Sequence, residues 1–577
     1  MKKNLSMELT KTPDIDPPPF TFVSRDFDAA DVDQLESIAG KLLERPIESA
    51  AALRQWIYDW SEVGAMVSSE WARRLTAMNR DTRDEEAKRR HLTFQGEVMP
   101  RWQVLDDKLD RHYLASPFRK ELGEEFAVFD RVKEQSARLF REENTRLGAE
   151  DRALGARYQE MRGSMAVEFR GETLTMQQCM AKLQEQDRAL REEAFLAASE
   201  RTYAAREKTD ELFDEMLGLR ARMAANAGFD NFLDFQFARL FRFDYTTRDC
   251  TRFQDAVEKV VVPALVKLRD RRCKRLGLET LRPWDRQVCL FGVAPRDLFR
   301  DQQGYVELVE RIFGAVDPRF AADFDILVRN GLLDLMSRPG KAPGGYNCPV
   351  DDIGLPFIFY NAVGRRGDLR VLLHEGGHAF HTIATRGMPV KAYRRAPTEF
   401  AEVASMSMEM FGFERLGEIL EPDELREVTY GQFSGALHVF ASVALVDAFQ
   451  AWIYTHPGHS REERTAKWLE LADRFTARID WTGVEKYHEG AWQAIPHLFL
   501  QPLYYIEYGI AQLGALQLWL LERNDHEAAV AGYRRALALG GSRPLPELFE
   551  TAGIRFAMDE EVLRALVPAI LEVIEAL

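Results

Sequence analysis

The spacing of hydrophobic positions predicts helices along most of the chain. Near the N-terminus, Val32, Leu35, Ile38 and Leu42 recur every three or four residues, which places them on one face of a helix. The same period returns later in the chain, at residues 53–63, 212–223, 437–452, 465–475 and 528–539. We therefore expect a mostly α protein whose helices bury apolar stripes against one another.

The strongest strand pattern lies at residues 354–361, with residues 344–349 as a partner strand or a turn. Pro356 has no backbone N–H to donate, so it would confine the strand to a sheet edge or to the strand's first residues. An edge strand could bind an extended peptide through main-chain hydrogen bonds. A small structural hairpin is the equal alternative on the residues alone.

A His-Glu-x-x-His pattern stands inside the apolar run 371–381. On a helix, His374 and His378 lie one turn apart on the same face, where two imidazoles can bind one metal ion. Glu375 follows the first imidazole and could serve as general base. The pattern therefore predicts a catalytic metal site.

The residues around this pattern predict a helix over about 368–386. Asp368 is the expected N-cap, because its carboxylate can accept a free backbone N–H, and Gly387 fits the stop. Gly376 and Gly377 each disfavour a helix by about 1 kcal/mol relative to Ala. Two glycines in mid-helix therefore indicate close approach by another helix or by a substrate.

A third metal ligand must come from another segment. His381 lies seven residues from His374, about 10 Å along the axis, too far to share an ion with both imidazoles. The next acidic cluster, at residues 397–410, reads as a second helix that carries Glu399, Glu402 and Glu409. Two His and one Glu, with a fourth position open to water, form the ligand set of catalytic zinc.

At this point the chain resembles the thimet oligopeptidase and oligoendopeptidase F family of zinc metallopeptidases. The likeness covers roughly residues 200–560, and it is carried by residues 374–381, 402–405, 496–497 and 504–512, with weaker blocks at 228–232 and 338–346. The resemblance implies a fold of two helical lobes around a deep channel that admits short, unstructured peptides. It also implies a small β-sheet near the metal.

The resemblance further implies one Zn²⁺ per chain, with Glu402 as the third ligand, and hydrolysis of oligopeptides by a metal-activated water with Glu375 as base. A His and Tyr pair would donate to the oxyanion. These donors are His497, Tyr505 and Tyr508, with Tyr504 as a rival, because residues 498–503 replace the Gly-Gly-Tyr loop of the thimet oligopeptidase branch. Expected substrate contacts are Gly344, Gly345 and Tyr346, and residues that could hydrogen-bond to a ligand are His381, Glu399 and Glu409.

Two other interpretations fit parts of the pattern. A zinc carboxypeptidase of similar helical fold would carry the same His-Glu-x-x-His and a downstream Glu. A helical peptide-binding protein with a structural zinc is a non-enzyme alternative. Structural zinc sites usually fill all four positions with protein ligands, often Cys, and no Cys lies near His374 in sequence.

Composition limits the partners. The net charge of -15 argues against nucleic acid, whose phosphates need a basic surface. The five Cys form no C-x-x-C pair, and an odd number fits reduced thiols, so we expect a cytoplasmic protein. The N-terminus lacks the apolar core of a signal peptide, so we expect none, and no apolar run reaches the roughly 18–20 residues that span a bilayer.

We expect three regions in chain order. Residues 1–20 end in three consecutive prolines and read as a mobile tail or an extended arm. Residues 21–200 form an N-terminal helical region. Residues 201–577 form the zinc peptidase catalytic region, which contains the active-site helix.

Overall fold

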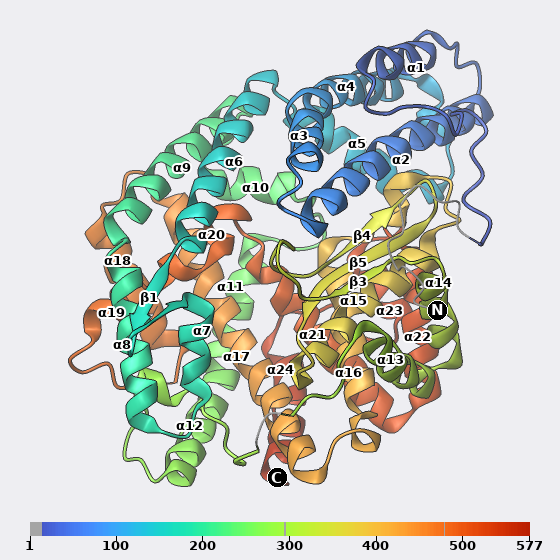
Figure 1. The fold of residues 1–577 in the computed structure, drawn as a ribbon. Coiled ribbons are helices and arrows are strands. Elements are labelled where there is room, and N and C mark those ends of the chain that lie inside the picture. Colours follow the sequence, from blue (N-terminus) through green and yellow to red (C-terminus); the bar gives the residue numbers. More distant parts are fainter. Residues whose placement is uncertain (1–13, 294–295, 478) are drawn as a thin grey trace. The chain divides into compact units, whose positions relative to one another are not determined.

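A computed structural model describes residues 14–293, 296–477 and 479–577. The chain forms two compact units. Unit 1 comprises Met1–Arg138, Pro295–Ile419 and Gly514–Phe556, and unit 2 comprises Leu139–Ala294, Leu420–Leu513 and Ala557–Leu577. Helices dominate both units, and the strands are few and short (Figure 1), which confirms the predicted fold class. Each unit gathers segments from distant parts of the chain, whereas the predicted boundary at residue 200 follows chain order and stays a prediction.

Unit 1 contains a helical N-terminal part and the elements around the His-Glu-x-x-His pattern. Its helices are α1 (Val32–Glu44), α2 (Ala50–Arg80), α3 (Glu85–Thr93), α4 (Met99–Ala115), α5 (Ala127–Leu139), α13 (Gln302–Val316), α14 (Pro318–Arg329), α15 (Arg366–Thr385), α16 (Thr398–Phe413), α22 (His526–Leu539) and α23 (Leu545–Thr551). Its strands are β3 (Leu333–Met336), β4 (Tyr346–Val350) and β5 (Leu355–Ala362).

The sheet of unit 1 has the order β3-β5-β4, with β3 parallel and β4 antiparallel to β5. The strongest predicted strand is therefore the middle strand, with β4 as the expected partner. Of the two places expected for Pro356, the sheet edge is excluded and the first residues of the strand are confirmed. Pro356 is tolerated because it is the second residue of β5, where it faces Pro349 of β4. The sheet lies beside α15 (Figure 1), so it supports the helix that carries the two His.

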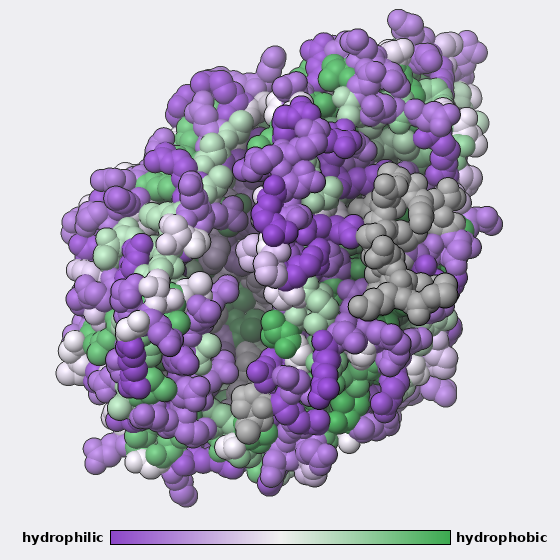
Figure 2. All heavy atoms as spheres, in the orientation of Figure 1, coloured by the Kyte–Doolittle hydropathy of each residue, from purple (hydrophilic) through white to green (hydrophobic). Residues whose placement is uncertain are grey.

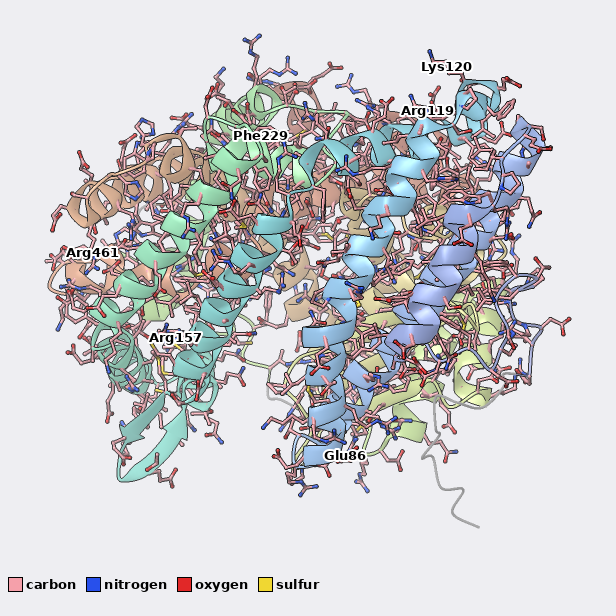
Figure 3. The ribbon with its side chains drawn as sticks, turned by 90° about the horizontal axis from the view of Figure 1, so that it is seen from above. Glu86, Arg119, Lys120, Arg157, Phe229 and Arg461 are labelled. Atoms are coloured by element: carbon pink, nitrogen blue, oxygen red, sulfur yellow. The ribbon has the colours of Figure 1, made fainter. Side chains whose placement is uncertain are left out.

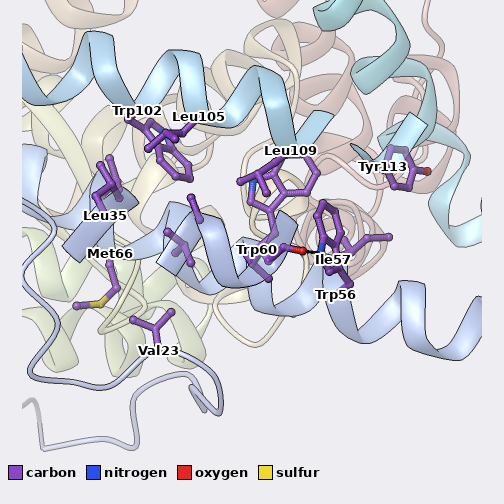
Figure 4. Close-up of a cluster of buried hydrophobic side chains, with 14 of the residues drawn as sticks. Val23, Leu35, Trp56, Ile57, Trp60, Met66, Trp102, Leu105, Leu109 and Tyr113 are labelled. Carbon is purple, nitrogen blue, oxygen red and sulfur yellow. Dashed lines mark hydrogen bonds between the residues drawn. The ribbon is translucent and has the colours of Figure 1, made fainter. Parts of the chain in front are cut away.

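An aromatic core holds the N-terminal helices of unit 1 together. Trp56 and Trp60 of α2 meet with ring centroids 5.3 Å apart, and Leu105 and Leu109 of α4 pack on the same cluster (Figure 4). The periodic positions predicted from sequence, such as Leu35, are buried there. This burial of apolar area is the main favourable term in folding these helices.

Residues 1–13 of the predicted tail lie outside the described residues. The part that follows is an extended arm along unit 1. The Asp14 backbone N–H donates to Asn330 Oδ1 at 2.9 Å, and the Thr21, Phe22 and Val23 backbone N–H groups donate to the buried Glu62 carboxylate. These bonds tie the arm to α14 and α2.

Over its described residues, unit 2 consists of helices and one β-hairpin. Its helices are α6 (Glu142–Gly163), α7 (Met176–Ala181), α8 (Arg188–Tyr203), α9 (Arg206–Asn226), α10 (Phe232–Arg239), α11 (Thr247–Ala256), α12 (Val262–Leu276), α17 (Pro422–Thr455), α18 (Arg461–Phe475), α19 (Glu485–Glu489), α20 (Pro496–Leu500) and α24 (Glu560–Glu575). Strands β1 (Ala166–Phe169) and β2 (Glu172–Thr175) pair antiparallel. Helix α21 (Tyr505–Asn524) begins in unit 2 and continues into unit 1.

Helix α17 corrects one sequence expectation. By length and composition it could cross a membrane, because an 18-residue window within Pro422–Thr455 has a mean hydropathy of 1.5. However, 67% of that window is buried inside the protein, as in the core helix of a soluble domain, so the evidence for a span is weak. The visible surface of the protein is rich in charged side chains. Figure 2 shows hydrophilic side chains over most of the visible face, and Figure 3 shows Arg157 and Arg461 on outward faces of α6 and α18.

The two mid-helix glycines of α15 allow close packing, as predicted. A Cβ on Gly377 would lie 2.6 Å from the Ala404 carbonyl oxygen and 2.6 Å from Ser405 Cα of α16. A Cβ on Gly376 would lie 2.3 Å from the Phe313 ring. The backbones of α15 and α16 can therefore approach only because no side chain intervenes.

We expect Gly377→Ala to lower the free energy of unfolding by about 1–3 kcal/mol, because a methyl group would push against the rigid backbone of α16. Gly367→Ala is the matched control, since a Cβ at Gly367 meets nothing within 4 Å and Ala favours helices by up to about 1 kcal/mol. Urea unfolding of both variants would measure the difference. Equal stability of the two would contradict the proposed contact.

Candidate active site

The start of α15 is fixed by a carboxylate in its first turn. Asp368 Oδ2 accepts the backbone N–H of Arg365 at 2.8 Å and of Val363 at 2.9 Å, and Oδ1 accepts the Tyr360 phenol at 3.0 Å. The expectation that Asp368 is the N-cap is wrong, because the helix begins at Arg366 and Asp368 reaches back to the residue before it. The buried carboxylate still satisfies N–H groups that the helix start leaves open.

Helices α15 and α16 bring three predicted ligands together. His374 and His378 lie one turn apart, with ring centroids separated by 4.9 Å. Glu402 Oε2 lies 3.5 Å from His374 Nε2 and 3.8 Å from His378 Nε2. One ligand atom from each residue falls within 4.8 Å of the other two. The structure thus places the two imidazoles and the carboxylate around one point.

The three side chains fit a zinc ion in spacing and in chemistry. Zinc bonds of about 2.0–2.2 Å in a tetrahedron separate neighbouring ligand atoms by about 3.3–3.6 Å, close to the distances found here. Two imidazole nitrogens and one carboxylate oxygen also form the donor set of many catalytic zinc sites. Three protein ligands leave a fourth position for water or substrate.

Glu409 orients one of the imidazoles. Its Oε1 lies 2.6 Å from His374 Nδ1, and Arg370 lies 3.5 Å from its other oxygen. Burial lowers the pKa of His374, but the hydrogen bond and charge of Glu409, together with Glu402, raise that pKa to about 9. A metal can bind Nε2 only when the proton on that nitrogen leaves, and the Nδ1 proton shared with Glu409 then keeps the ring turned toward Glu402.

We expect Glu409→Gln to weaken metal binding by about 10–100-fold, because the amide cannot hold the His374 ring with the same strength. Glu418→Gln is the control. Glu418 is an exposed acid of the same unit, so this substitution removes the same charge away from the metal site. Titration with a metal-buffered zinc indicator would measure both affinities. Equal affinity in the two variants would contradict the orienting role of Glu409.

Glu375 is buried beside this cluster and carries a free acceptor. Among the described residues, its Oε2 has no hydrogen-bond partner, although it is shielded from solvent. Burial raises the pKa of Glu375 to about 7, and the negative charges of Glu402 and Glu409 act in the same direction. A carboxylate with a pKa near neutrality can both take up and release a proton. Asn347 Nδ2 donates to the Glu375 backbone carbonyl at 3.3 Å and ties β4 to this turn of α15.

The remaining imidazoles of α15 differ in their surroundings. Burial, followed by the charge of His374, lowers the pKa of His378 to about 4, against the opposing charge of Glu402. Burial also lowers the pKa of His381 to about 3. The His381 ring packs near Phe400, with centroids 6.5 Å apart, so it faces an apolar contact. Glu399, one turn before Glu402 on α16, is buried.

The predicted substrate loop lies at the start of β4. Gly344 has φ +97°, and a Cβ on Gly345 would lie 2.7 Å from the Tyr360 ring. The Tyr346 ring stacks on Phe359 at 4.9 Å, and its phenol accepts a hydrogen bond from Asn79 at 3.1 Å. The backbone conformation at Gly344 and the close Tyr360 ring at Gly345 therefore explain why glycine stands at these two positions. Contact of this loop with a substrate stays a prediction.

Lys341 anchors the loop that precedes Tyr346. Its Nζ donates to Asp334 Oδ1 at 2.9 Å and to the backbone carbonyls of Asp334 and Met336. The side chain is buried, so the Gly340-Lys341 pair is a structural anchor of the loop that precedes Tyr346.

The predicted oxyanion donors lie together in unit 2. The His497 ring lies 5.0 Å from Tyr505, 5.7 Å from Tyr508 and 5.8 Å from Tyr504 by ring centroids. The Tyr508 phenol lies 3.3 Å from His497 Nε2. Burial lowers the pKa of His497 and raises the pKa of Tyr505, so both side chains are neutral donors or acceptors near pH 7. The structure groups all four residues, as the aromatic segment predicted.

A buried ion pair fixes the backbone that carries these rings. Arg242 donates to Glu507 Oε1 at 2.8 Å and to the Leu503 carbonyl oxygen. Leu503 adopts φ +66°, and its N–H donates to Gln450 Oε1 at 2.7 Å. These contacts hold the turn that enters α21, and they set where Tyr505 begins the helix.

Sequence reasoning missed several residues that support the site. Ser405 donates to Glu402 Oε2 at 3.1 Å, and Arg370 and Asn347 contact Glu409 and Glu375 as described above. Helical spacing could have indicated two of them, because Ser405 is three residues after Glu402 and Arg370 is four before His374. Asn347 is distant in sequence, and no local signal points to it.

Residues 181–568 match the profile of peptidase family M3, and residues 22–133 match that of the peptidase M3 N-terminal domain. A comparison with curated protein sequences gives no match.

Several solved structures share the fold over nearly the whole chain. PZ peptidase A with an inhibitor has 26% identity and a TM-score of 0.88, and the match covers 96% of this chain and 99% of that one. A protein described as oligoendopeptidase F has 27% identity and a TM-score of 0.88, with 97% and 99% coverage. Another so described, from Bacillus anthracis str. Ames, has 26% identity and a TM-score of 0.83, with 97% and 99% coverage.

Proposed function

Because the chain belongs to peptidase family M3, we propose that this peptidase is a zinc-dependent endopeptidase that cleaves short, unstructured oligopeptides. The observation that carries the zinc proposal is the convergence of His374, His378 and Glu402 within 4.8 Å, with the buried acceptor Glu375 beside them. The similarity to oligoendopeptidase F structures supports an endopeptidase over a carboxypeptidase.

In the proposed mechanism, His374, His378 and Glu402 hold one zinc ion, which when bound would acidify a water and polarise the peptide carbonyl. Glu375 accepts a proton from the attacking water and passes it to the departing amine. Its raised pKa suits both steps, because the carboxyl group must bind and release a proton near neutral pH.

The side chains of unit 2 have a proposed role as donors. A neutral His497 and the phenols of Tyr505 and Tyr508 could each donate a hydrogen bond to the carbonyl oxygen as its charge develops. One such donor in a preorganised site typically contributes about 2.7–4 kcal/mol to the transition state. Replacement of each by Phe, with KM and kcat measured separately, would identify which phenol acts, because a transition-state donor affects kcat.

The substrate class can be tested with peptides of defined ends. We expect cleavage of short peptides whose C-termini are amidated, because an endopeptidase needs no free carboxylate at the scissile residue. Mass spectrometry of the products would locate the cut bonds. Products that arise only from free C-termini, one residue at a time, would support the carboxypeptidase interpretation.

We expect a chelator to abolish hydrolysis and a stoichiometric amount of Zn²⁺ to restore it. The reason is that the family reaction needs a Lewis acid at the ligand cluster. Metal analysis before and after chelation would measure the zinc bound per chain. Full activity at zero metal content would contradict the proposal. The five cysteines are free, which supports the further proposal of a cytoplasmic location.

A further inference from the structure

Unit 2 contains a second cavity site of its own, distinct from the His-Glu-x-x-His cluster of unit 1. The cavity has a volume of about 480 Å³, and its wall comes from α7, α8 and the segment that contains α19. Figure 1 shows these helices near the β1–β2 hairpin, and α8 contacts both α7 and α19. Its size falls within the range of small-molecule sites in proteins, about 300–1,000 Å³.

The charge of the wall is unusual for this protein. The chain as a whole carries a net charge of -15, yet the cavity is lined by four basic side chains, Arg162, Arg206, Arg286 and Lys486. No acidic side chain lines it among the residues that the structure describes. Like charges that converge on one space repel each other, so an anion in that space would be stabilised.

Two of the four cations are already paired outside the cavity. Lys486 Nζ donates to Glu200 at 2.7 Å, and Arg206 donates to Glu207 at 2.9 Å. Their charges are therefore partly neutralised. Each also lies over the Tyr203 ring, which fixes its direction.

Arg286 is different. Within residues 14–293, 296–477 and 479–577, no hydrogen bond or ion pair holds its guanidinium, and the residue is exposed to the cavity it lines. The neighbouring Arg272 donates to the backbone carbonyls of Asp285 and Val288 and adds a second positive charge. A guanidinium in these surroundings gains from an anionic ligand.

Arg286 lies between two cavities and lines both of them. It lines a neighbouring cavity of about 400 Å³, together with Phe195, Trp481 and Met180, which face both. The second wall includes Arg269 and Arg272 and, in the described part of the chain, no acid either. The two spaces therefore meet at Arg286 and at an apolar surface.

The rest of the wall is aromatic and apolar. Phe195 lies 6.1 Å from Trp481 and 6.2 Å from Tyr487 by ring centroids, and Tyr203 meets Tyr487 edge-on at 6.1 Å. Such a surface favours a flat or branched apolar group. A bare phosphate would leave it unused, so the cavity fits an anion that carries an apolar body.

We propose that this cavity of unit 2 binds a carboxylate attached to an aromatic or branched apolar group, with the Arg286 guanidinium as the main partner of the carboxylate. Arg can engage both oxygens of a carboxylate at once, which gives affinity and direction. The ligand is either a free N-acylated amino acid or the C-terminal residue of a peptide. Both share this chemistry, and neither requires hydrolysis at unit 1.

Calorimetric titration with N-acetylphenylalanine tests the proposal. The full chain is used as purified and again after chelation, so that a carboxylate on a bound metal cannot account for the heat. We expect saturable binding at millimolar ligand in both cases and none for N-acetylphenylalanine amide. Absence of binding, or equal binding of acid and amide, would overturn the proposal.

The Arg286→Gln variant should weaken this binding by about tenfold or more, because it removes a charged partner of the carboxylate. Arg222→Gln is the matched control, since Arg222 is an exposed arginine of the same unit that lines neither cavity. The control should bind as the unchanged protein does. Equal affinity of both variants would remove Arg286 from the site.

A second variant keeps the test independent of any folding defect in Arg286→Gln. Gln177 is exposed in the first turn of α7 and lines the cavity, so Gln177→Glu adds a negative charge there while favouring the helix start. We expect weaker binding than in Gln184→Glu, which adds the same charge at an exposed residue outside the cavity wall. Equal affinity of the two would contradict the proposal.

A peptide arm distinguishes the two sources of carboxylate. A short peptide that ends in Phe is compared with its C-terminal amide in the Glu375→Gln background, where the peptide should survive. Tighter binding of the free-acid peptide than of N-acetylphenylalanine supports a peptide C-terminus as the ligand. Equal binding supports a free acid. No preference for acid over amide in either arm overturns the site.

Discussion

Glu375→Gln is expected to lower kcat for peptide hydrolysis by about 10²–10⁴-fold, the usual contribution of a positioned general base. The amide has nearly the same shape as the carboxyl group but cannot take a proton from water. Its effect on the fold should be small, because the Oε2 that changes has no hydrogen-bond partner among the described residues. Steady-state hydrolysis of a quenched fluorescent peptide would measure the loss.

Two measurements make this result specific. Zinc content by elemental analysis should stay near that of the unchanged protein, because Glu375 is not among the three converging ligands. Glu375→Asp keeps a carboxylate but withdraws it by one methylene. Its kcat should therefore fall between that of the unchanged protein and that of Glu375→Gln. Hydrolysis by Glu375→Gln at the rate of the unchanged protein would mean that another group serves as base.

His374→Ala is expected to remove both the metal and the activity. Its Nε2 faces Glu402 at 3.5 Å and its Nδ1 is held by Glu409, so the variant loses a ligand and leaves a buried acid without its partner. Loss of one of three protein ligands should reduce zinc content after dialysis to near zero, with kcat below detection. Elemental analysis and the peptide assay would be run on the same preparation.

The matched control for this loss is His381→Leu. His381 lies on the same helix and is more deeply buried than His374, and its ring faces Phe400. Leu keeps the volume without a hydrogen-bonding group, so zinc content should be retained. Zinc loss in this variant, or zinc retention in His374→Ala, would require a different ligand set.

The metal ligands could be predicted from sequence because the evidence for them is local. His374 and His378 are four residues apart, so any helix places them on one face. Glu402 and Glu409 are seven apart on the next helix, and the structure indeed points both at His374, one from each side of the ring. The resemblance then chose Glu402 among the three acids of that helix.

Other expectations failed where local rules compete with packing. The Asp368 carboxylate caps the helix from its first turn, because Tyr360 and the Val363 backbone also bond to it. The strand with Pro356 is the middle of the sheet, because β3 pairs with it from a segment that precedes the predicted hairpin. Of the two places expected for Pro356, only the one among the first residues of the strand is therefore correct. Helix α17 is apolar enough to suggest a membrane span, and its burial within unit 2 accounts for that composition.

The sequence by itself determined the helical class, the paired imidazoles and the acids available to complete a metal site, because helix periodicity fixes which side chains share a face. Only the tertiary structure decided that Glu402 stands 3.5 Å from His374 and that Gly377 lets the two helices approach so closely. It alone brought Arg286 and Lys486, 200 residues apart in the chain, to one cavity wall, which has no acid among the residues that the structure describes. The reason is that contacts between distant segments depend on how whole helices pack, and no spacing along the chain encodes that distance.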